Sequence, residues 1–169
     1  MSSDAAPDIA EEFTAPKQGR KGDGGTYLVV ADDSEEFATA LRYACFAAKS
    51  HRGRLGILHI IEDQDFQHWG TVEGRIKKEL REKAEQYLWT IAKTANDLNG
   101  TIPSLYVAEG EPGEALTKTI DADNHIVQLI LGGKSGSAPG PLVSFCIGKG
   151  LERMKVPVVV VPSHIKEFS

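Results

Sequence analysis

The chain has 169 residues, the size of one domain with a substantial core. Its formal net charge is −5, and both signs are scattered along the chain, which argues against nucleic acid as a partner. Apolar runs are too short to cross a bilayer, and the N-terminus lacks the apolar core of a secretory signal. We therefore expect a cytoplasmic protein that has no membrane partner.

Residues 1–25 combine Ala, Pro, Ser, Gly and charged side chains, which predicts a flexible N-terminal tail. Gly22 and Gly24 in this tail precede the first strand, whereas the glycines of a dinucleotide fingerprint follow it. They are therefore not interpreted as a nucleotide loop. The remainder, residues 26–165, is predicted to form a single domain.

The first predicted strand covers residues 26–31 and is compact and β-branched. Ser34 then stands where a helix N-cap belongs, and acidic residues follow in the first turn. The helix presents one apolar face and ends at Gly53; this face comprises Phe37, Leu41, Ala44, Cys45 and Ala48. Residues 55–61 are the second predicted strand.

Residues 62–72 are polar and irregular, and we expect a loop over the end of the sheet. Its aromatic residues, Phe66 and Trp69, either flank a ligand or cover the core. From Glu73 to about Asn99 the sequence predicts a long amphipathic helix. Its apolar stripe comprises Ile76, Leu80, Ala84, Tyr87, Leu88, Ile91, Ala95 and Leu98.

The second half continues the alternation of strands and helices. It contains predicted strands at residues 102–107, 127–131 and 156–161, a helix that starts at Pro112, and a short helix that starts near Ser144. The last two strands are almost entirely apolar, as expected when helices cover both faces of a parallel sheet. The pattern predicts an α/β fold, a three-layer doubly wound sandwich of five strands and four helices.

Two cysteines, Cys45 and Cys146, lie in apolar helical patterns without metal-ligand spacing. We expect both to be reduced, buried thiols. The five histidines are scattered along the chain, so we predict no metal ion.

The segment Gly132-Gly133-Lys134-Ser135-Gly136-Ser137 follows a buried strand, where backbone N–H groups often meet a phosphate. It is not a Walker A loop, because Gln128 stands where that motif requires a glycine. The ends of the first two strands, with Asp32 and Ile60, are expected to converge on the same crevice. Alternatively, the glycines only form a turn and Asp32 only caps the first helix.

The segment from Val29 to Glu62, VVADDSEEFATALRYACFAAKSHRGRLGILHIIE, resembles the first half of a universal stress protein domain. The segments EGEPGEAL, VQLILGGKSG and KVPVVVVP resemble its second half in the same order. This resemblance implies a flavodoxin-like (adenine nucleotide alpha hydrolase-like) sheet in the order 3-2-1-4-5. It also implies homodimers and, in one subgroup, ATP binding.

The ATP-binding subgroup has G-x-x-G, nine residues, and then Gly-Ser or Gly-Thr. Gly133 and Gly136 match the first part, which implies that they and Ser137 contact phosphates while Asp32 and Ile60 surround the nucleoside. The second part departs from the pattern, because Cys146-Ile147, or Ser144-Phe145 in the other alignment, replaces the Gly-Ser pair. Ser144 is expected to substitute partly for the missing hydroxyl, whereas Phe145 and the turn at 139–141 are expected to shrink the pocket.

We therefore expect a cytoplasmic, dimeric stress-response protein that acts as a binding module and not as an enzyme. It is expected to bind ATP, AMP or another anion weakly and to dimerise through its last strand. The alternative is an ATP-binding universal stress protein that hydrolyses ATP slowly, and a structural dimer without nucleotide is a third possibility.

Overall fold

The structure is a computed structural model that describes residues 24–62, 73–100, 102–136 and 138–168. The predicted flexible tail, apart from its last two residues, lies outside these ranges, as do the aromatic residues of the predicted loop at 62–72. Gly24 donates a hydrogen bond from its N–H to the carbonyl of Arg52, so the chain contacts the domain just before the first strand.

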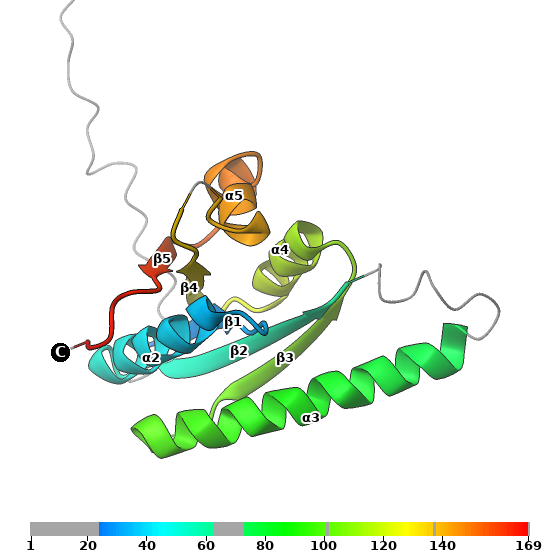
Figure 1. The fold of residues 1–169 in the computed structure, drawn as a ribbon, viewed down its shortest axis with the longest axis horizontal. Helices are drawn as coiled ribbons and strands as arrows, with labels where there is room; N and C mark the ends of the chain where they lie inside the picture. The colour runs from blue at the N-terminus through cyan, green and yellow to red at the C-terminus, as the bar shows by residue number, and fades with distance from the viewer. Residues whose placement is uncertain (1–23, 63–72, 101, 137, 169) are drawn as a thin grey trace, which may run out of the picture.

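One five-stranded sheet forms the middle of the molecule (Figure 1). Its strands are β1 (Thr26–Val30), β2 (Arg54–Ile61), β3 (Ser104–Glu109), β4 (Ile126–Gly133) and β5 (Val158–Pro162). They lie in the order β3-β2-β1-β4-β5, and every pair is parallel. This confirms the predicted fold class and strand order. The chain changes direction across the sheet between β1 and β4, so the loops that follow these strands leave a crevice there.

Four α-helices cover the two faces of the sheet in the described part of the chain. They are α2 (Glu35–Ser50), α3 (Glu73–Asn99), α4 (Pro112–Ala122) and α5 (Pro141–Ile147), and a 3-10 turn, η3 (Leu151–Arg153), follows. Helices α2 and α3 pack on one face, and α4 and α5 pack on the other (Figure 1). The three predicted layers are therefore present.

Helix α2 forms for the reasons that its sequence suggests. Ser34 is the N-cap and its hydroxyl accepts a hydrogen bond from the N–H of Phe37. The predicted apolar face is buried against β1, β4 and α3, and Ala40 and Ala44 are completely inaccessible to solvent. Small residues on this face let the helix lie close to the sheet. This close packing fixes the position of the connection between β1 and α2.

A phenylalanine joins the two helices on the opposite face. The ring of Phe145 in α5 lies against Gly113 of α4 and Gly150 before η3, and a Cβ at either glycine would come within 2.7 Å of it. A bidentate ion pair between Arg153 and Glu114, at 2.6 and 3.0 Å, joins η3 to the same helix. The α5 segment is thus held against α4.

Three elements begin two or more residues away from their predicted starts. Strand β3 begins at Ser104, two residues late, because Pro103 has no N–H to donate to a ladder and Ile102 is 80% exposed. Strand β5 begins after Pro157 for the same reason, although the carbonyl of Pro157 still accepts from Leu129. The last helix begins at Pro141 and not near Ser144, because its N-cap is Gly140.

Candidate functional site

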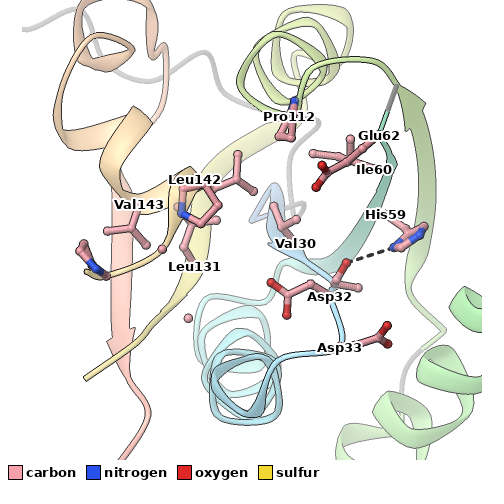
Figure 2. A pocket seen from close by; sticks show the side chains of 15 residues that line it. Val30, Asp32, Asp33, His59, Ile60, Glu62, Pro112, Leu131, Leu142 and Val143 are labelled. Atoms are coloured by element: carbon pink, nitrogen blue, oxygen red, sulfur yellow. Dashed lines mark hydrogen bonds between the residues drawn. The ribbon is translucent and has the colours of Figure 1, made fainter. Parts of the chain in front are cut away.

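A pocket of about 520 Å³ opens at the carboxyl edge of the sheet (Figure 2). Its floor comes from the ends of β1 and β4, with Val30 and Leu131. Ile60 and Glu62 lie on one side and Leu142 of α5 on the other, as Figure 2 shows. The volume falls within the range of small-molecule sites, which is about 300 to 1,000 Å³.

Two aspartates and a histidine lie side by side in the pocket lining, which also contains Glu62. Asp32 points toward β4, whereas Asp33 points toward α3 (Figure 2). The Oδ1 atom of Asp32 accepts hydrogen bonds from the N–H, at 2.9 Å, and the hydroxyl of Ser34. Asp32 therefore supports the start of α2, as expected if it caps this helix. It also lines the pocket.

His59 is oriented by a backbone contact just after the carboxyl end of β1. Its Nδ1 lies 3.1 Å from the carbonyl of Ala31, which can only accept, so Nδ1 carries the proton. Its ring also meets the edge of Tyr87 from α3 at 5.2 Å. Burial, followed by the charges of Asp33 and Asp32, raises the pKa of Tyr87 to about 12, so this phenol stays neutral.

The electrostatics of the pocket are unfavourable for a polyphosphate. Asp32, Asp33 and Glu62 line it, and none of the described lining residues is a lysine or arginine. Lys134 follows β4 and faces Glu36, whose pKa is lowered by its own backbone N–H, then by Ser34 and by Lys134. The arrangement suits a neutral nucleoside better than several negative charges.

The glycines after Leu131 differ in their surroundings. Gly132 lines the pocket, and a Cβ there would lie 2.7 Å from the backbone of Glu36 in α2. Gly133 is outside the pocket lining and pairs with Pro162 at the end of β4. Gly136 has a φ of 115° and open space around it, so its conformation is what requires glycine. Ser137 lies outside the described residues.

Ser144 does not stand at the start of the last helix. It is exposed, it is the fourth residue of α5, and its N–H bonds to the carbonyl of Gly140 at 3.0 Å. Because Pro141 has no N–H, only Leu142 and Val143 offer donors in this turn. The sequence predicts that the ring of Phe145 reduces the pocket. In the structure Phe145 is 8% exposed and packs against α4, so its ring lies outside the pocket.

The structure thus brings Asp32 and Ile60 together, and it leaves Gly133, Gly136 and Ser144 outside the pocket lining. Sequence reasoning missed Leu142, Val143 and Pro112 as lining residues. The turn Pro139-Gly140-Pro141, which was expected to reduce the space, does line the pocket. Pro141 was the signal that could have identified Leu142 and Val143. Proline is common at the first position of a helix, so it marks the start of α5 and places these two residues in its first turn.

The described residues hold no cluster of three His, Cys, Asp or Glu side chains placed to ligate a metal ion. Within the same ranges, no helix has the length and apolar character needed to cross a membrane.

Comparison with known proteins gives one family and a set of similar folds. The model of the universal stress protein family matches residues 26–162. A search of curated proteins finds no match. A universal stress protein UspA from Lactobacillus plantarum has 16% identity, with 83% of this chain and 99% of that chain covered, at a TM-score of 0.62.

Two further solved structures of similar fold contain nucleotides. One is a universal stress protein in complex with cAMP, with 19% identity, coverage of 82% of this chain and 97% of that chain, and a TM-score of 0.53. The other is a universal stress protein family protein from Arabidopsis thaliana with AMP bound, with 13% identity, coverage of 82% and 91%, and a TM-score of 0.57. At these identities the likeness concerns the fold. The family model, by contrast, matches the sequence itself over residues 26–162. This chain therefore belongs to the universal stress protein family.

Proposed function

We propose that this protein is a stress-response binding module whose pocket holds an adenine nucleoside with one phosphate, such as AMP. The observation that carries the proposal is the pocket at the β1–β4 crevice, where Asp32 and Ile60 face the same space. A carboxylate accepts hydrogen bonds from ribose hydroxyls, and apolar side chains such as Ile60 and Leu142 cover a flat base. Relatives of similar fold that contain AMP and cAMP support this ligand class.

A single phosphate would face Gly132 at the end of β4, away from Asp33, which points toward α3, and from Glu62, which lies on the side of Ile60. The longer chain of ATP would meet the Pro139-Gly140-Pro141 turn, and α5 offers few N–H donors to hold it. ATP binding is therefore proposed to be weak. The protein acts through ligand-dependent interactions and not through turnover.

We also propose that the protein forms a homodimer through β5. This strand lies at the edge of the sheet with one side of its backbone unpaired within the described chain. Val160 in β5 is 36% exposed. A second copy would cover this apolar edge, which would otherwise promote aggregation. A cytoplasmic location agrees with the two free, buried cysteines, Cys45 and Cys146.

Mass spectrometry of the nucleotide that copurifies with the native protein tests the proposal. AMP or a related mononucleotide is expected, and Ile60→Ala should reduce its occupancy because that variant removes one wall of the pocket. Ile147→Ala serves as the matched control, since Ile147 is apolar but lies outside the pocket lining. Equal nucleotide occupancy in both variants would place the ligand elsewhere.

A further inference from the structure

A second pocket, of about 310 Å³, lies between α2, the end of α3 and the C-terminal segment. One stripe of α2 supplies Arg42, Cys45, Phe46 and Lys49, and the other lining residues are Leu98, Asn99, Lys166 and Phe168. Figure 1 shows the C-terminus beside the end of α2. None of these residues lines the pocket at the carboxyl edge of the sheet.

The lining of this pocket is positively charged, whereas the net charge of the whole chain is −5. Arg42, Lys49 and Lys166 line it, no lining residue is acidic, and no ion pair engages these three within the described chain. The guanidinium of Arg42 donates to the hydroxyl of Thr39, which in turn donates to the carbonyl of Ser163. One cation is thereby held in place.

The other side of the pocket is apolar. Phe168 stacks on Phe46 with ring centres 6.4 Å apart and meets the ring of Tyr43 edge-on at 5.3 Å. Leu98 was expected on the buried stripe of α3, yet it is 52% exposed because it faces this pocket. Burial raises the pKa of Cys45 to about 11, so its thiol adds no negative charge.

We propose that this pocket binds a small amphipathic anion, with an acidic head group on Arg42, Lys49 and Lys166 and an apolar body against Leu98, Phe46 and Phe168. Three cations without carboxylate partners match one carboxylate, and the adjacent rings match a short alkyl chain or a single ring. The volume lies at the lower end of the range for small-molecule sites, about 300 Å³, which limits the ligand to a short acid. This site is independent of the proposed nucleotide site.

Calorimetry of the full chain with octanoate and with octan-1-ol tests the proposal. Octanoate should bind, and octan-1-ol should bind about tenfold more weakly because it lacks the charge. The double variant Lys49→Gln/Lys166→Gln should weaken octanoate binding by about tenfold. Phe168→Ala should weaken the binding of both compounds, because the variant removes part of the apolar wall.

The matched control is Lys118→Gln/Lys149→Gln, which removes the same charge from exposed positions on α4 and after α5. Octanoate affinity should be unchanged in this control, and AMP affinity should be unchanged in the Lys49/Lys166 variant. Absence of octanoate binding, equal affinity for the alcohol, or an equal loss in the control would overturn the proposal. Failure of AMP binding in all variants would contradict the proposed function and leave this site standing.

Discussion

The two glycines at the end of β4 serve different structural purposes. A Cβ at Gly132 would collide with the backbone of Glu36 at 2.7 Å, and that backbone belongs to the first turn of α2. A Cβ at Gly133 would meet a side-chain methyl of Val160 at the exposed edge of the sheet. The first contact is rigid, whereas the second can relax by rotation of a partly exposed valine.

Gly132→Ala should therefore lower the free energy of unfolding by about 1 to 3 kcal/mol, as overpacking against backbone does. Gly133→Ala is the matched control and should cost less, because Val160 can move. Urea denaturation of both variants checks this difference. Equal losses would mean that α2 does not press on Gly132.

A half-buried phenol and a carboxylate form a pair on the α4 face of the sheet. The hydroxyl of Tyr106 donates to Oδ2 of Asp123 at 2.7 Å, and His125 contacts Oδ1. Burial raises the pKa of Asp123, but these hydrogen bonds outweigh it and hold the pKa below its usual range. The ionised carboxylate therefore contributes stability above its unfolded pKa, and this contribution is lost as the pH falls through the lower folded value.

Tyr106→Phe should destabilise the protein by about 1 to 3 kcal/mol at neutral pH, since it removes a hydrogen bond to a charged acceptor. The difference from the parent protein should shrink as the pH falls below the ordinary aspartate pKa of about 3.9, because the Asp123 carboxylate then becomes protonated. Urea midpoints measured across this pH range provide the check. A difference that does not change with pH would rule out the linkage to Asp123.

At the scale of elements, α5 and η3 are fixed to α4 mainly through Phe145. Its ring fills the space beside Gly113 and Gly150, and no side chain larger than hydrogen fits at either glycine without a shift. This packing positions the segment from Pro139 to Val143, which forms a wall of the pocket at the carboxyl edge of the sheet. A residue in the core thus sets the position of the site.

Phe145→Ala should cost about 3 to 5 kcal/mol of stability, as expected for a large-to-small change in a core. It should not improve ATP affinity, because the ring lies outside the pocket. Ile147→Ala on the same helix, which is 61% exposed, should change stability by less than about 0.5 kcal/mol. Tighter ATP binding by a folded Phe145→Ala variant would show that the ring does obstruct the phosphates.

Most elements could be predicted because each carries a local signal. Helix α2 has Ser34 as its cap and a continuous apolar face, and β4 and β5 are apolar runs that end at glycine or proline. The start of α5 could not be predicted so well, since Gly140 makes no side-chain cap and Ser144 resembles one.

The candidate site was only partly predictable for a related reason. Asp32 and Ile60 follow directly from the ends of neighbouring strands, whose meeting at one edge is a property of parallel sheets. Leu142 and Pro112 enter the pocket because α5 packs against α4, and this depends on the fit of Phe145 between two distant glycines. No periodicity in the sequence encodes that fit.

At the scale of the whole molecule, two pockets in the described part of the chain contrast in charge. The pocket at the carboxyl edge is acidic, and the one beside α2 and the C-terminus is basic, although the chain as a whole has a net charge of −5. The proposed dimer would cover β5.

Val160→Lys should shift the protein from dimer toward monomer, because a charge on the edge strand opposes pairing with a second copy. Val160 suits this test better than Val159, whose side chain packs against the core. Sedimentation velocity measures the change, and Trp89→Lys on α3, where Trp89 is 65% exposed, is the control. A parent protein that sediments as a monomer at micromolar concentration would remove the proposal.

The central claim is that the pocket at the carboxyl edge accepts a nucleoside monophosphate and has little room for a triphosphate. Calorimetric titration of the full chain with AMP, and with ATP and magnesium, tests it most directly. We expect AMP to bind and ATP to bind no more tightly than AMP, with a Kd for ATP in the micromolar range or weaker. A submicromolar Kd for ATP would contradict it.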